Sequence, residues 1–197
     1  MTGMARPCKQ PADMTLDAAM HTFWRHGYHA TSLRDLVGAM ALSRSSIYQR
    51  YDDKAGLFIA ALEHYRERQI AALEALYERS DSAWGFIEAL FHEVADEAGD
   101  QGASCGCLIF NAATELGGES SPPADKAREC VGAVERFFAA VIRAAQREGA
   151  IDARHDPAAS ARYMALSMSG LRLMNKRGVT TDEARAAVAH VLGGLRG

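Results

Sequence analysis

The sequence offers little to support a β-sheet, a membrane span or a secretion signal. No alternating run of β-branched residues lasts long enough for a strand. No apolar run approaches the ~20 residues that a spanning helix needs, and the first ten residues, MTGMARPCKQ, lack a hydrophobic signal core. Five prolines are scattered near expected helix ends. These absences predict an all-α protein that stays in the cytoplasm.

Cysteine is also scarce, and the usual catalytic signatures are missing. In the cytoplasm we expect free thiols at the four cysteines, which are Cys8, Cys105, Cys107 and Cys130. Seven histidines form no HExxH pair, and neither a glycine-rich phosphate loop nor a nucleophile elbow occurs. One Cys-x-Cys pair is a weak zinc signal, because residues i and i+2 of a helix point nearly opposite ways. We therefore expect no enzyme, no metal and no cofactor.

Charge is distributed unevenly along the 197 residues. The formal net charge is −3, yet residues 1–54 carry +2 and the remainder carries −5. This asymmetry permits nucleic-acid binding at the N-terminal end and indicates that the larger part is not itself a polyanion binder. A hydrophobic content of 48% is ample for a helical core.

Residues 31–54 have the pattern of two short helices joined by a tight turn. Thr31 or Ser32 can cap the first helix, and Ser43 can cap the second. The apolar residues of the first recur at i, i+3, i+4 and i+7, which are Leu33, Leu36, Val37 and Met40. In the second, Ile47 faces inward while the outward side suits a DNA major groove, with Arg44, Ser45, Ser46, Tyr48 and Gln49. The alternative is an ordinary helical hairpin.

The surrounding segment resembles the DNA-binding domain of TetR-family transcriptional regulators. The resemblance rests on Gly27-Tyr28, Ala30-Thr31, Ser43 with Ile47-Tyr48, and Lys54 before Leu57-Phe58. Two positions depart from the pattern, because Ala41 stands where the turn usually has glycine and Arg50 where histidine is common. The resemblance implies a three-helix helix-turn-helix domain over 1–54, with a flexible arm over 1–12, and a helical ligand-binding and dimerisation domain over 55–197.

This reading assigns DNA contacts to the second helix and its neighbours. Arg44 and Gln49 are expected on bases, and Tyr48 with Lys54 on phosphate. The full set of expected DNA-binding residues is Thr31, Ser43, Arg44, Ser45, Ser46, Tyr48, Gln49 and Lys54. The expected partner is a double-stranded operator.

Amphipathic helices are expected through the rest of the chain. A long helix runs from Lys54 to about Arg79, and the resemblance implies that it carries motion from a ligand site to the DNA reader. The helix from Asp156 is apolar on two faces, and the last runs from Thr181 to about Leu195. We expect these last two helices to form a homodimer, which a charge at Val188 or Leu192 should break.

An effector pocket is expected in the C-terminal part. Its candidate residues are Trp84, Phe91, Cys107, Phe110, Asn111, Phe137, Tyr163, Met164 and Met168, with Glu115 and Ser169 as further polar groups. The alternative for each is simple core packing. The run GCLIFNAATEL is similar to a segment of a TetR-type repressor that senses electrophiles through a cysteine, which makes Cys107 a candidate sensor; the alternative is a packed, inert thiol.

Two functions remain open. The first is a homodimeric repressor released from its operator by a small apolar or electrophilic effector. The second is a helical small-molecule or electrophile-binding protein whose DNA reader is vestigial. Salt-dependent and sequence-selective operator binding separates the two.

Overall fold

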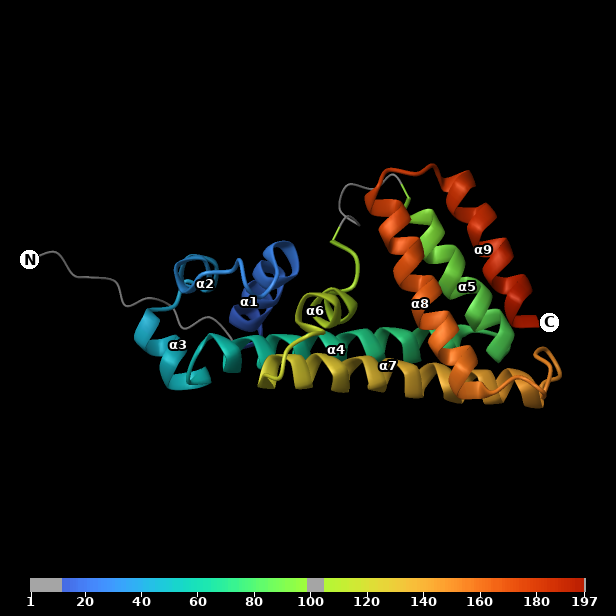
Figure 1. Ribbon diagram of the computed structural model, residues 1–197, viewed down its shortest axis with the longest axis horizontal. Coiled ribbons are helices and arrows are strands. Elements are labelled where there is room, and N and C mark those ends of the chain that lie inside the picture. The colour runs from blue at the N-terminus through green and yellow to red at the C-terminus, as the bar shows by residue number, and fades with distance from the viewer. Residues whose placement is uncertain (1–11, 99–104, 197) are drawn as a thin grey trace, which may run out of the picture.

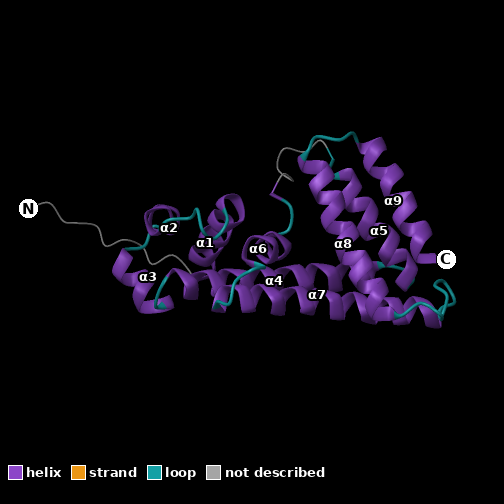
Figure 2. Cartoon of the chain, in the orientation of Figure 1, coloured by secondary structure: helices purple, strands orange, loops and turns teal. Residues whose placement is uncertain are grey.

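The computed structural model describes residues 12–98 and 105–196, and the expected arm over 1–12 lies outside this range except for Ala12. Within the described residues every regular element is a helix, as expected from the sequence (Figure 2). The helices are α1 (Ala12–His26), α2 (Leu33–Met40), α3 (Arg44–Tyr51), α4 (Lys54–Arg79), α5 (Ala83–Asp96), α6 (Leu108–Leu116), α7 (Pro122–Arg147), α8 (Pro157–Lys176) and α9 (Thr181–Arg196).

Capping side chains set most of the helix starts. The hydroxyls of Ser82 and Ser121 accept backbone N–H groups at the starts of α5 and α7, and the Asp53 carboxylate does so for α4. Prolines occupy the first turns of α7 and α8, where the missing N–H breaks no helical bond. These local signals are why the expected and observed boundaries agree within a few residues.

The helices form an elongated molecule with α1–α3 at one end and α5, α8 and α9 at the other (Figure 1). The long helices α4 and α7 run side by side between the two ends, and α6 crosses them close to α1. At 1.5 Å per residue, the 26 residues of α4 span about 39 Å, so one helix belongs to both parts of the molecule.

The core is continuous from the N-terminal helices into the C-terminal bundle. Phe23 of α1 packs edge-on against Phe58 of α4 with ring centroids 5.0 Å apart. The ring of Trp24 meets that of Tyr65 at 5.1 Å. In the C-terminal part Phe86 packs against Phe137. Buried residues of α4 belong to the core at both ends of the molecule. A displacement of this helix therefore changes the packing at both ends.

Among the described residues, no helix combines the length and apolar character that crossing a membrane would require.

Candidate functional site

The helix-turn-helix forms as the sequence predicts, through two serine caps and one strained turn residue. Ser32 and Asp35 make a reciprocal capping box at the start of α2, and the Ser43 hydroxyl accepts the Ser46 N–H at 3.1 Å. Ala41 lies between the helices with φ +50°. The absent glycine is therefore replaced by an alanine that takes the same left-handed conformation at some cost in strain.

The outward face of α3 carries most of the expected DNA contacts. Arg44, Ser45, Gln49 and Arg50 are exposed, and Tyr48 is 40% exposed although it is aromatic. Ile47 is fully buried beneath them. Ser43 and Ser46 are committed to each other at the helix start, with their hydroxyl oxygens 2.9 Å apart. A short, firmly seated helix thus presents two cations, an amide and a phenol on one open face.

Thr31 differs from its expected role. Its side chain is 1% exposed, and its hydroxyl donates a hydrogen bond to the Gly27 carbonyl at 2.6 Å. Ser32 is the residue that caps α2. A buried hydroxyl that is already bonded has no surface to offer a duplex, so Thr31 is a structural residue of the link between α1 and α2.

The Lys54 side chain also makes contacts that the sequence did not predict. Its ammonium donates to the carbonyls of Tyr28 at 2.8 Å and Thr31 at 3.0 Å, with His29 further away at 3.4 Å. It also sits 4.5 Å from the centre of the Tyr28 ring. The sequence showed a cation at a helix start, whereas the fold directs that cation back onto the α1–α2 link. Its predicted phosphate contact competes with these internal bonds.

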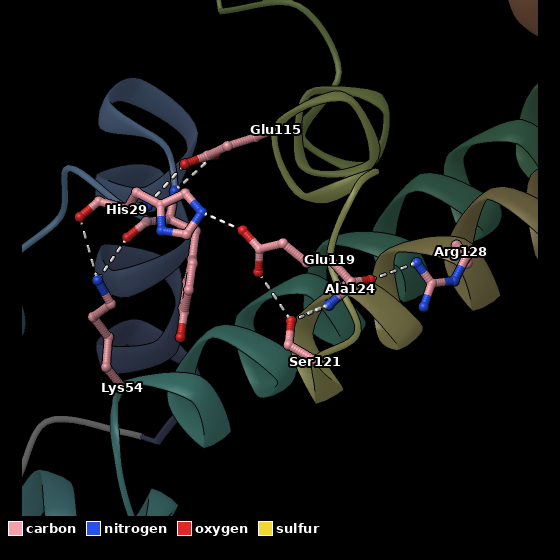
Figure 3. Close-up of polar contacts among 8 residues, drawn as sticks. His29, Lys54, Glu115, Glu119, Ser121, Ala124 and Arg128 are labelled. Carbon is pink, nitrogen blue, oxygen red and sulfur yellow. Dashed lines mark hydrogen bonds and ion pairs between the residues drawn. The ribbon is translucent and has the colours of Figure 1, made fainter.

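The opposite side of this link is held by α6 (Figure 3). The two carboxylate oxygens of Glu115 accept the backbone N–H groups of Tyr28 at 2.9 Å and His29 at 2.8 Å. The His29 imidazole lies 2.7 Å from the Glu119 carboxylate. Glu115 and Lys54 thus bind residues 27–31 from two sides. We call this arrangement the clasp. It joins the helix-turn-helix to the C-terminal part through charge-assisted hydrogen bonds.

Glycine at position 27 is required by the clasp. Its φ is +79°, and a Cβ added there would lie 2.7 Å from the nearer carboxylate oxygen of Glu115. Glu115 was expected among the polar groups of the pocket, and that expectation is wrong. The side chain points away from the C-terminal bundle because α6 ends beside α1, a proximity that no local pattern encodes.

The other end of α6 opens on a small cavity of about 110 Å³ against α8. Four of the residues expected around an effector pocket line this cavity, which are Cys107, Phe110, Asn111 and Ser169. The remaining lining residues were not predicted: Cys105, Gly106, Arg172, Leu173 and Lys176. A signal did exist in the sequence, because Ser169, Arg172 and Lys176 recur at i, i+3 and i+7 and therefore share one face of a helix.

Cys107 is the N-cap residue of α6, which begins at Leu108. Cys107 is 5% exposed and lies beside the buried Tyr65 of α4. Burial raises the pKa of the Tyr65 phenol, Cys107 adds to the rise, and the Arg172 guanidinium opposes it. The cavity lies between α6 and α8, and Tyr65 of α4 is a neighbour of its lining residue Cys107.

The other predicted pocket residues do not line this cavity. Met164 and Met168 are buried in the core with Trp84 and Phe91. Phe137 is half-buried and packs against Phe86 and Phe138. Tyr163 is 39% exposed and reaches α9, where its hydroxyl lies 3.5 Å from the Val191 carbonyl. Trp84, Phe91, Met164 and Met168 fill the space between helices, which agrees with the core alternative for these four residues.

One face of α8 is apolar and open. Leu166 is 69% exposed and Leu173 is 60% exposed, on the same face as Tyr163 and Gly170. The second expected apolar face is buried, with Leu171 among its members. On α9, Val188 and Leu192 are 0% and 9% exposed, so they pack inside the protomer and a charge there would unfold it. The expectation that they test a dimer is therefore wrong.

Comparison with known proteins agrees with this architecture. Residues 16–61 match the profile of the bacterial regulatory proteins of the tetR family, and residues 86–191 match the tetracyclin repressor-like C-terminal domain. The chain is 29% identical over 179 residues to the HTH-type transcriptional repressor ComR of Escherichia coli K12, covering 90% of this chain and 85% of ComR.

Solved structures give the same result. A cysteine mutant of the TetR family transcriptional regulator CifR, complexed with 26bp double-strand operator DNA, has a TM-score of 0.79 and 27% identity, covering 97% of this chain and 100% of that one. The reduced form of E. coli NemR, at 17% identity and a TM-score of 0.77 over 90% of this chain and 94% of its own, shares the fold. The chain belongs to the TetR family of bacterial DNA-binding transcriptional regulators.

Proposed function

We propose that the protein is a homodimeric repressor that binds an operator through α3 and releases it when an effector alters α6. The clasp is the observation that carries the proposal. One helix of only nine residues holds the α1–α2 link at its C-terminal end and borders the cavity at its N-terminal end. The two sites are about 12 Å apart along this helix, by its rise per residue.

A short helix transmits such a change because it moves as a unit. If a molecule in the cavity shifts the start of α6, the Glu115 carboxylate shifts with it and pulls on the Tyr28 and His29 amides. The α1–α2 link positions α2, which supports α3 together with α4. A displacement there changes the distance between the two reading helices of a dimer, and two-half operator binding depends on that distance.

The dimer is supported by the open apolar face of α8. A second copy of the chain is the occupant that fits best, because a 26-bp operator such as that bound by CifR has room for two half-sites one helical turn apart. The cost of leaving Leu166 and Leu173 in water is removed when the same face of a second α8 covers them. Leu166→Glu should therefore give monomers by light scattering, whereas Ala71→Glu, at an exposed alanine of α4, should leave the dimer intact.

The DNA-reading role is tested on the protein's own upstream DNA. Footprinting should give a protected site with two half-sites, and the affinity should fall steeply with ionic strength. Arg44→Ala should cost about 1–3 kcal/mol and relax preference at one base pair of each half-site. Arg79→Ala, at an exposed arginine far along α4, is the matched control and should bind like the wild type. An unprotected upstream region with a shallow salt dependence would instead support a vestigial reader.

A further inference from the structure

The cavity between α6 and α8 has an unusual balance of charge for its size. Two cations, Arg172 and Lys176, lie on its α8 wall, and none of the lining residues that the structure describes is acidic. Within the described residues neither cation forms an ion pair with a carboxylate. Two positive groups one helical turn apart repel each other unless an anion lies between them.

The uncharged polar side chains of the cavity are partly used by internal hydrogen bonds. The Asn111 amide donates to the Cys105 carbonyl at 2.7 Å, and the Ser169 hydroxyl donates to the Ala165 carbonyl at 3.0 Å. One N–H of the Asn111 amide remains for a ligand, and the charged donors of the cavity are the Arg172 guanidinium and the Lys176 ammonium. A planar guanidinium forms paired hydrogen bonds with a carboxylate, and a nearby ammonium adds a point charge.

The rest of the lining sets the size and character of the molecule. Phe110 and Leu173 supply an apolar surface next to the cations. A volume of about 110 Å³ is well below the roughly 300–1,000 Å³ of cavities that enclose drug-sized ligands. The cavity therefore fits an acid with a short hydrocarbon body better than an aromatic drug or a polyphosphate.

We propose that this cavity binds a small organic monocarboxylate, with the carboxylate on Arg172 and Lys176 and the hydrocarbon part against Phe110 and Leu173. Identification of this acid as the effector rests on the proposed function, whereas its binding does not. The position explains how occupancy reaches α6, because Phe110 belongs to that helix and the cations belong to α8. When the two cations of α8 bind the carboxylate, its hydrocarbon part packs against Phe110, so the packing of α6 against α8 changes.

A binding experiment on the full chain without DNA tests the site. Sodium propionate and sodium butyrate are the probes, the uncharged propionamide and butyramide are their shape-matched counterparts, and sodium chloride at equal concentration keeps the ionic strength constant. Calorimetric titration and the rise of the unfolding temperature both report binding, since a ligand of the folded state stabilises it in proportion to the logarithm of its concentration. The acids should bind and the amides should not.

The variants separate the cavity from general electrostatics. Arg172→Gln and Lys176→Gln should each raise the Kd for butyrate at least tenfold, and Arg172→Lys should recover part of the loss. Arg177→Gln is the matched control, because Arg177 is an exposed cation at the same end of α8 that does not line the cavity. It should bind butyrate like the wild type. If Arg172→Gln fails to fold, the Kd of Lys176→Gln for butyrate decides the test, because Lys176 is exposed and its replacement should not disturb the fold.

Three results would overturn the inference: no binding of either acid, equal binding of the amides, or an unchanged Kd in the cavity variants. Sulfate that binds as tightly as butyrate would also overturn it, by showing a site for any anion. Operator binding by the same proteins is measured separately without any acid. If the protein binds its operator but no acid, the proposed function stands and the inference fails. If the wild type shows no sequence-selective operator binding, the proposed function fails whether or not the acids bind.

Discussion

Glu115 of α6 accepts the backbone N–H of His29 at 2.8 Å, although 86 residues separate the two in the sequence. With the second bond to Tyr28, this carboxylate forms a two-bond polar link between the C-terminal helices and the helix-turn-helix. Backbone amides are fixed partners, because substitution of His29 or Tyr28 leaves the N–H in place. The link therefore depends on the acidic side chain alone.

Replacement of that side chain should loosen the α1–α2 link. Glu115→Ala leaves two amides without their acceptor, and we expect faster hydrogen exchange at Tyr28 and His29, with about 1–2 kcal/mol lost from the free energy of unfolding. Glu115→Gln keeps one carbonyl oxygen and should fall between the alanine variant and the wild type. Unaltered exchange at both amides in Glu115→Ala would show that the clasp does not hold in solution.

Gly27→Ala should disturb the same contact from its other side. The methyl group would meet Glu115 at 2.7 Å in a backbone conformation with φ +79°, and a left-handed residue other than glycine costs roughly 1–2 kcal/mol by itself. Chemical denaturation should therefore show that the free energy of unfolding falls by about 2 kcal/mol or more. Gly38→Ala, in α2 with open space around the added carbon, should be neutral or slightly stabilising. Because both variants act on one contact, Gly27→Ala combined with Glu115→Ala should cost less than the sum of the two.

Lys54 offers a choice between an internal and a phosphate-binding role. Lys54→Met keeps most of the aliphatic stem but leaves the Tyr28 and Thr31 carbonyls without their cation, so the unfolding temperature should fall. Operator titrations at several salt concentrations decide the second role. A salt slope reduced by about one unit per half-site would mean that Lys54 also neutralises a phosphate, and an unchanged slope would confine it to the clasp.

Stability should fall in acid through Glu63 on α4. The Arg66 guanidinium lowers the pKa of Glu63 to about 2 from 4.5, with burial opposing the shift and Lys126 of α7 assisting it at 2.6 Å. A folded-state pKa below the unfolded value means that ionised Glu63 stabilises the fold above about pH 4.5 and that this contribution is lost as the pH falls toward 2. Urea unfolding should show that Glu63→Gln has a lower free energy of unfolding than the wild type at pH 7, and that this difference is smaller at pH 3. Glu67→Gln, at an exposed residue of the same helix, should show no such trend.

Local signals in the sequence were sufficient for the helices and for the reading surface. Ser43 and Ile47 define α3 by cap and buried face, and Arg44, Tyr48 and Gln49 then have to point outward because a helix fixes the direction of each side chain. The TetR resemblance rests on the same short-range spacing. Ala41 takes its left-handed turn for a reason also visible in sequence, since two capped helices must be joined there.

The tertiary structure alone decided where the long-range partners lie. Glu115 was expected in the pocket, but α6 ends beside α1 and brings it to residues 27–31. The start of α4 brings the Lys54 ammonium to the same link, where it bonds the Tyr28 and Thr31 carbonyls. Arg172 and Lys176 had no assigned role from the sequence, and the fold places them in one cavity with Cys107 and Phe110. Periodicity tells which face of a helix is apolar, whereas the helix that covers that face is fixed by packing among residues far apart in the chain.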